Sequence, residues 1–235
     1  MNFLSRRQLR NPDRVFPVVL TKDNSPSVFA VGGHRQMDDG LRQLSDEIRR
    51  DAVIAKSVEV CVLEFGLDET VTKVVDFVSP AAFVPPPTKS SLTTPFYEAY
   101  ARSVYEVLER QKTVREVEGR DYGHGWIFQW SDGRAGDTEK RSLALAAKSA
   151  AAKHGVETFF FGVGPKEHID FAVLRELSQP ERPPLWMPGV ENFGKFFEWL
   201  RLSLQNRSQT RNGEPVELPN PFIDSNNPHG WAARA

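Results

Sequence analysis

The sequence predicts an α/β protein with a doubly wound, mostly parallel sheet of six strands flanked by helices. Apolar runs of strand length alternate with segments of helical periodicity, as in βαβ units. The run 156–163 is apolar almost throughout, which is typical of a parallel strand buried on both faces. Two other runs, 15–20 and 126–130, end in loops rich in side-chain oxygen, at the edge where such sheets bind ligands.

The composition is that of an ordinary globular domain. The chain has 235 residues, of which 40% are hydrophobic and 26% charged, and its formal net charge is −1. This length suits one well-cored α/β domain, and no linker-like stretch divides the middle. A net charge near zero argues against a general attraction to nucleic acid or to an anionic membrane. No run approaches the ~20 apolar residues of a membrane span, so we expect a cytoplasmic protein. We also expect a monomer.

The amino terminus is interpreted as a lead-in, residues 1–13. Arg6 and Arg7 are superficially similar to a twin-arginine export signal. Polar residues follow at once, and the later apolar run 15–20 is too short for the apolar region of such a signal. We expect the domain to cover residues 14–205 and a C-terminal extension, rich in proline and polar residues, to cover 206–235.

The first half of the chain predicts three strands. They span residues 15–20, 58–65 and 71–78. A helix at 36–50 connects the first two and keeps its apolar residues on one face. The short spacer 66–69 suits a hairpin, which makes 71–78 the one antiparallel edge strand. The single Cys61 lies in an apolar strand and is interpreted as a buried core thiol.

A second helix is expected to begin at Thr94 and Pro95. Three consecutive prolines, 85–87, keep the preceding segment in a loop. Threonine is a good helix cap and proline suits the first helical position, so this pair has a structural explanation of its own. The glycines of 119–125 end the helix before the strand 126–130.

The second half predicts further strands and helices in alternation. They are an alanine-rich helix at 138–153, the strand 156–163, a short helix near 169–177, a short strand near 185–186 and a final helix carrying Phe193, Phe196, Phe197, Leu200 and Leu204 on one face. Alanine side chains are small, so the first of these helices can lie close to the sheet.

Three segments supply oxygen ligands that suit a hard cation. Asp23, Ser25 and Ser27 follow the first strand, Thr94 opens a helix, and Asp132 follows the strand 126–130. Mg²⁺ prefers about six oxygen ligands at about 2.0–2.1 Å. A carboxylate and two hydroxyls from one loop fill only part of that shell. Each segment alone is explained by turn or cap chemistry, but the sheet brings their ends together.

With these residues the sequence resembles the von Willebrand factor A (vWA) domains. The metal-ion-dependent adhesion site of that family consists of a D-x-S-x-S loop, a threonine and an Asp-Gly pair. The resemblance implies a sheet order 3-2-1-4-5-6 and a divalent metal, Mg²⁺ or else Mn²⁺ or Ca²⁺, on Asp23, Ser25, Ser27, Thr94 and Asp132. One departure is Pro26, where the family usually has glycine; proline fixes φ and removes an N–H.

Within that superfamily the chain is similar to short bacterial TerY-type proteins, which are associated with tellurium resistance. The similarity lies in the order of Phe16-Pro17-Val18, Trp126-Ile127-Phe128, Arg182-Pro183-Pro184-Leu185 and the aromatic stretch 192–200. It implies a stress-response complex with a protein partner. If the aspartates act partly through water, as the resemblance implies, the metal stays electron-poor and favours an acidic residue of that partner. Basic residues in the surrounding loops, His34, Arg35 and Arg134, are the candidate rim.

Two alternatives remain at this point. The metal site of a vWA-like scaffold could be degenerate, with Pro26 as the reason. A Mg²⁺-dependent phosphohydrolase of the haloacid-dehalogenase kind needs Asp-x-Asp after the first strand, and here Ser25 holds the second position. No glycine loop follows that strand, which disfavours a nucleotide site. The five histidines, His34, His124, His154, His168 and His229, have no ligand or triad spacing, so we expect no enzyme.

Overall fold

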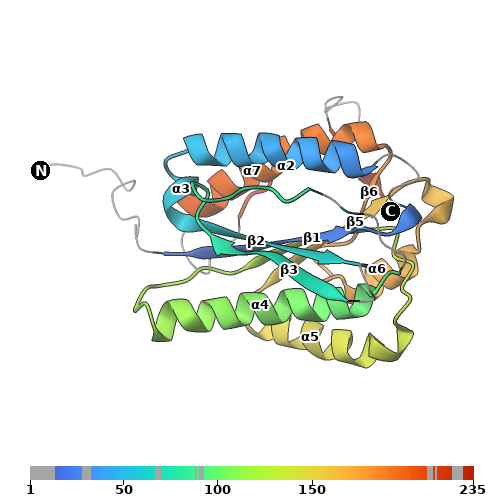
Figure 1. The fold of residues 1–235 in the computed structure, drawn as a ribbon, viewed down its shortest axis with the longest axis horizontal. Helices are drawn as coiled ribbons and strands as arrows, with labels where there is room; N and C mark the ends of the chain where they lie inside the picture. The colour runs from blue at the N-terminus through green and yellow to red at the C-terminus, as the bar shows by residue number, and fades with distance from the viewer. Residues whose placement is uncertain are drawn as a thin grey trace, which may run out of the picture.

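The computed structural model describes residues 14–27, 33–66, 70–87, 89, 93–210, 214, 216–223 and 230–235. Figure 1 shows three layers, with the sheet in the middle, helices α2 and α7 over one face, and helices α4 and α5 over the other. The strands of the parallel core point the same way, so their carboxyl ends share one edge of the molecule. This architecture confirms the predicted doubly wound α/β fold.

The sheet has seven strands in the order β3-β2-β1-β4-β5-β6-β7. Their bounds are β1 Phe16–Asp23, β2 Val58–Phe65, β3 Val71–Val78, β4 Trp126–Ser131, β5 Glu157–Val163, β6 Leu185–Met187 and β7 Ala233–Arg234. The expected antiparallel edge strand is β3, which pairs with β2. The expectation of six strands with one antiparallel strand was incomplete, because β7 adds a second antiparallel edge beside β6.

The helices alternate with the strands as expected. They are α2 Gly33–Arg50, α3 Ile54–Ser57, α4 Phe96–Glu116, α5 Arg141–Lys153, α6 Phe171–Leu177 and α7 Phe193–Gln209. Helix α2 starts earlier than residue 36, so the expected loop position of His34 and Arg35 was wrong, and both lie in its first turn. Helix α5 is preceded by a short 3-10 turn, Thr138–Lys140.

The core on the α7 side of the sheet is unusually aromatic. Phe128 of β4 stacks on Phe159 of β5, with ring centroids 4.8 Å apart, and Trp130 meets Phe196 of α7 edge to face at 5.3 Å. Aromatic pairs in these geometries add to the stabilisation from burial alone. The carboxyl ends of β1 and β4 are therefore carried by a rigid platform.

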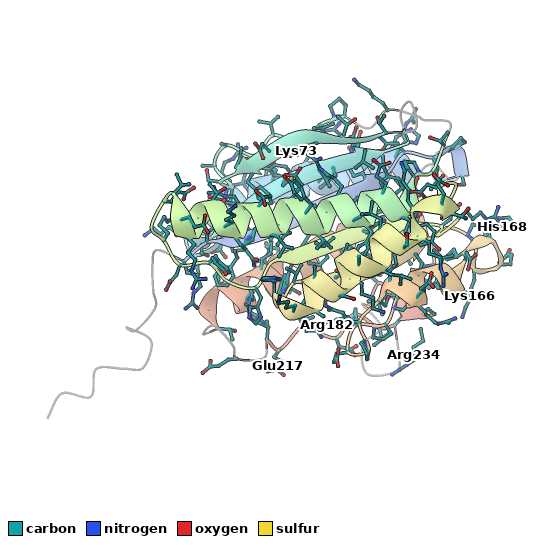
Figure 2. The ribbon with its side chains drawn as sticks, turned by 90° about the horizontal axis from the view of Figure 1, so that it is seen from below. Lys73, Lys166, His168, Arg182, Glu217 and Arg234 are labelled. Atoms are coloured by element: carbon teal, nitrogen blue, oxygen red, sulfur yellow. The ribbon has the colours of Figure 1, made fainter. Side chains whose placement is uncertain are left out.

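The C-terminal extension takes part in this core. Helix α7 runs to Gln209, past the expected boundary at residue 205. Further along, Trp231 is 2% exposed and its ring lies 5.0 Å from that of Phe196. Strand β7 then pairs with β6. The extension closes one edge of the sheet, at the side where Figure 2 labels Arg182 and Arg234.

The single cysteine belongs to the core of the domain. Cys61 is fully buried in β2, and burial raises the pKa of its thiol, so it is an inert core residue. Across the described residues, no helix has the length and apolar character needed to cross a membrane.

Candidate metal centre

The predicted metal loops meet where the strand order reverses. Strands β1 and β4 are parallel neighbours, with Lys22 of β1 in register with Trp130 of β4. Asp23 and Ser131 therefore end adjacent strands at the same edge, and Asp132 follows directly. Ligand sites of open α/β sheets lie at this switch point.

The Asp23 carboxylate is oriented by hydrogen bonds to both of its oxygens. Its Oδ1 accepts a 2.8 Å hydrogen bond from the Ser25 backbone N–H, and its Oδ2 accepts a 2.6 Å bond from the Ser131 hydroxyl. The second bond joins the β1 loop to the β4 loop. Sequence reasoning gave Ser131 no role, although a hydroxyl beside a candidate ligand was the available signal.

The electrostatics around Asp23 suit a cation. The side chain is completely buried, and burial raises its pKa from 3.8 to about 6; the nearby negative charge of Asp132 also raises it. The hydrogen bonds from Ser131 and Ser25 oppose this shift. Two close carboxylates in a buried site are costly unless a positive charge joins them. The donor set therefore fits a divalent metal.

The serines of the first loop lie side by side. The Ser25 and Ser27 hydroxyls are 3.0 Å apart, with Ser25 2% exposed and Ser27 exposed. Pro26 is exposed between them. The proline therefore does not separate the two hydroxyls, and the loop presents them to the same side as a D-x-S-x-S loop requires.

Thr94 does not cap helix α4, contrary to the expectation. The helix begins at Phe96, and its first turn is capped instead by Asp137, whose Oδ1 and Oδ2 accept from the backbone N–H groups of Tyr97 and Glu98 at 3.1 and 2.8 Å. The Thr94 hydroxyl donates to no acceptor among the described residues. Its backbone carbonyl accepts from the Gly136 N–H at 2.9 Å, so the β4 loop holds Thr94 in place.

The β4 loop depends on Gly133. Its φ is +74°, and a side chain there would meet the Asp170 carbonyl at 2.6 Å. The Asp132 carbonyl accepts from the Asp170 N–H at 2.8 Å, and Asp132 Oδ1 accepts from the Arg134 N–H at 3.0 Å. Asp132 itself is buried, at 4% exposed.

Arg134 is an exposed rim residue with an unexpected partner. Its Nε donates to the His168 carbonyl at 2.9 Å, and Figure 2 shows His168 at the end of the molecule where the metal loops lie. Asp137, three residues further along the chain, is 6% exposed, and its carboxylate accepts from the first turn of α4. Arg134 and Thr94 also line a cavity of about 440 Å³.

The other rim candidates lie at the start of α2. Arg35 is exposed and His34 is half-buried. Behind them, Lys22 is fully buried and its Nζ lies 2.9 Å from Glu64 Oε1 and 3.5 Å from Asp38 Oδ1. Sequence reasoning missed this ion-pair group, which ties β1, β2 and α2 together directly behind Asp23.

No other metal centre competes with this one in the described part of the chain, where no three His, Cys, Asp or Glu side chains gather in a metal-binding group. The candidate site has only two carboxylates, and its remaining donors are hydroxyls. His229 lies outside the described residues.

Comparisons with solved structures identify the fold. The vWF domain of the type V pili tip protein Mfa5 from Porphyromonas gingivalis aligns with a TM-score of 0.59 at 9% identity, over 86% of this chain and 99% of that one. The chain has the fold of a vWA domain. Pilus adhesin SpaC from Lactobacillus rhamnosus GG aligns at 0.61 and 8% identity, over 83% of this chain and 31% of that one.

A third neighbour is proximal thread matrix protein 1 of the mussel byssus, with a TM-score of 0.58 and 12% identity, over 82% of this chain and 48% of that one. The chain thus spans about half of this neighbour and a third of the adhesin. No family model matches the sequence, and no curated protein matches it. Identities this low show the fold alone, so function has to be argued from the site.

Removing the cap of α4 should loosen the threonine segment. We expect Asp137→Ala to lower the free energy of unfolding by about 1–2 kcal/mol, since two backbone donors lose their acceptor. Equilibrium urea unfolding measures this. Glu139→Ala, an exposed acid of the same segment, is the matched control and should change stability by less than about 0.5 kcal/mol. Equal effects of both variants would contradict the capping role.

Proposed function

We propose that this chain is a metal-dependent protein-interaction module. In this proposal Asp23, Ser25, Ser27, Thr94 and Asp132 hold one divalent cation, and an acidic residue of a partner completes its shell. The single observation that supports it best is the 2.6 Å bond from Ser131 to Asp23, which joins the two aspartate-bearing loops at the switch point of the sheet.

The donor chemistry favours an external carboxylate. Five side-chain oxygens are one fewer than the about six that Mg²⁺ prefers, and only two of them carry charge. A metal so held keeps positive charge and an open position. A carboxylate is a hard oxygen ligand that supplies both the sixth donor and the missing charge.

The structural neighbours are consistent with this proposal. One structure of the mussel protein, aligned at a TM-score of 0.54, is described with a zinc-occupied MIDAS motif, and the aligned bacterial chains are a pilus adhesin and a pilus tip protein. For this chain we propose Mg²⁺, or else Mn²⁺ or Ca²⁺. We further propose that the chain is a cytoplasmic monomer and that its partner belongs to a stress-response complex of the TerY type.

A catalytic role is less favoured by the residues present. Ser25 stands where a phosphohydrolase of this kind would carry its second aspartate, and its hydroxyl faces Ser27. Cys61 is buried in β2, and burial raises the pKa of its thiol, so it is not an activated nucleophile. We therefore propose a binding module without catalysis.

Partner capture should depend on the metal. We expect the full chain to co-purify with its partner at saturating Mg²⁺ and to lose it in excess EDTA. Asp23→Ala should lose capture even with Mg²⁺, whereas Asp39→Ala, an exposed acid of α2, should retain it. Changing the partner's contacting acid to its amide should abolish capture. A partner that stays bound in EDTA would overturn the proposal.

Arg134 should contribute to affinity for an acidic partner. Its backbone N–H donates to Asp132, and its exposed guanidinium, held through Nε by the His168 carbonyl, can bind a carboxylate oxygen of the partner. We expect Arg134→Ala to weaken partner binding by about 2 kcal/mol and to leave metal affinity unchanged. Arg134→Lys keeps the charge and loses the planar fork, so its affinity for the partner should lie between those of wild type and Arg134→Ala. Titration of the purified partner measures this, and a loss below about 0.5 kcal/mol would remove Arg134 from the rim.

A further inference from the structure

A buried guanidinium lies at the amino-terminal edge of the sheet, opposite the metal centre. Arg207 belongs to the last turns of α7, is 2% exposed, and lies with its guanidinium carbon 5.1 Å from the centre of the Phe16 ring. Its Nε and Nη2 are buried and find no acceptor in the described chain. A buried charge without hydrogen-bond partners is unfavourable, so this group calls for an acceptor from outside.

A second arginine belongs to the same place. Arg14 is two residues before Phe16, on the same side of the chain by the alternation of an extended segment, and its Nε is also buried without a partner. The charges of Arg14 and Arg207 act on each other. Burial lowers the pKa of the half-buried His124 nearby, and the charges of Arg207 and Arg14 lower it further. Three nitrogens of two guanidiniums are therefore buried without a hydrogen-bond acceptor at one end of the sheet.

Glu157, whose negative charge acts on Arg207, is already hydrogen-bonded to other groups. Glu157 Oε2 accepts from Arg182 Nε and Nη2 at 2.9 and 2.7 Å, and its Oε1 accepts from the Trp126 indole N–H at 3.3 Å. Glu157 thus balances Arg182. The two positive charges of Arg14 and Arg207 remain without an ion-pair partner among the described residues.

Another arginine of the chain shows what the Nε–Nη2 edge of a guanidinium binds. Arg110 uses the same pair of nitrogens, Nε and Nη2, to hold the two oxygens of Glu59 at 2.6 and 2.8 Å. These two parallel N–H bonds form the fork that receives a carboxylate or a phosphate in bidentate fashion. In Arg207 the fork is buried and lacks its oxyanion.

We propose that Arg207 and Arg14 form a binding site for a small oxyanion of the phosphate class. The anion sits on the Nε–Nη2 edge of Arg207 and accepts a further bond from Arg14 Nε. Two uncompensated guanidinium charges match a dianion better than a monoanion. Because these nitrogens are buried, we expect only a small group to reach them, either a free anion or the phosphoryl end of a larger ligand. Because α7 and the segment before β1 both supply ligands, the anion would fasten the final helix to the first strand.

Binding of inorganic phosphate to the full chain tests this site. Titration calorimetry in EDTA, with ionic strength held constant by sodium chloride, keeps the metal centre out of the measurement. We expect phosphate to bind wild type and raise its melting temperature, and to bind Arg207→Met at least tenfold more weakly. Arg110→Met is the matched control, because the fork of Arg110 is filled by Glu59, and it should keep the affinity of wild type for phosphate.

Titrations with other anions show which kind of ligand the site binds. If O-phosphoserine binds as well as phosphate, the site takes phosphoryl ends; if only phosphate binds, it takes the free anion; both results support the proposal. Acetate binding as tightly as phosphate would overturn the assignment to a dianion. No phosphate-specific binding by wild type, or equal binding by Arg207→Met, would overturn the site itself. If Arg207→Met does not fold, Arg14→Gln replaces it, with the same expected loss of affinity.

Discussion

Asp23→Ala is expected to lower the affinity for Mg²⁺ or Mn²⁺ by at least about a hundredfold, because residues that merely support metal ligands already contribute about 10–100-fold. Asp23 offers a buried carboxylate whose two oxygens are oriented by Ser25 and Ser131. Its removal leaves one carboxylate and three hydroxyls, too weak a set to dehydrate the ion. Calorimetric titration of metal into the EDTA-stripped and dialysed protein measures the change.

Two variants sharpen this test. Ser131→Ala keeps every proposed ligand and loses only the bond that orients Asp23, so we expect a smaller loss of about 10–100-fold. Asp39→Ala removes an exposed carboxylate of α2 and should bind metal as wild type does. Metal affinity that is the same in Asp23→Ala and Asp39→Ala would show that the ion binds elsewhere.

The affinity for metal should depend on pH through the protonation of Asp23. Burial raises the pKa of Asp23 to about 6, so in the metal-free protein a proton occupies the carboxylate below that pH. Proton and metal then compete, and metal affinity should fall as the pH is lowered from neutral to about 5. For the same reason the metal-free fold is more stable with Asp23 protonated, and Asp23→Ala should fold normally.

The sequence was sufficient for the elements whose signals are local. The apolar run in β5 predicted a strand covered on both faces, and Phe159, Phe160 and Phe161 are all buried. Strand β7 was not predicted because Ala233–Arg234 is too short to show any alternation, and only its pairing with β6 makes it a strand. The cap of α4 was assigned to the neighbouring Thr94, whereas the true cap, Asp137, lies about forty residues further along.

In the candidate site, too, local features were predictable from the sequence and long-range contacts were not. A local motif places Asp23, Ser25 and Ser27 in one loop, and parallel-strand topology places Asp132 beside it. The bond between Ser131 and Asp23 joins residues 108 positions apart, so no local pattern contains it. Arg207 falls in the expected C-terminal extension, 206–235, and only the packing of α7 against Phe16 shows that its side chain is buried.

Trp231→Ala should be the most destabilising single change in the C-terminal extension, lowering the free energy of unfolding by about 3–5 kcal/mol. The indole ring packs against Phe161, Phe196 and Trp199 at centroid distances of 5.4, 5.0 and 5.4 Å. Its removal opens a cavity in the aromatic core under α7. Equilibrium urea unfolding followed by circular dichroism measures the change.

The controls decide whether the extension belongs to the folded domain. Ile223→Ala, a 47% exposed residue of the same extension, should cost less than about 0.5 kcal/mol. Trp231→Phe should cost less than Trp231→Ala, because it keeps an aromatic ring and removes an indole N–H that has no acceptor among the described residues. If Trp231 belongs to the cooperative core, the whole transition of Trp231→Ala shifts to lower urea and stays single. An unshifted transition would mean that the extension folds onto the domain without stabilising it, and the domain would then end with α7.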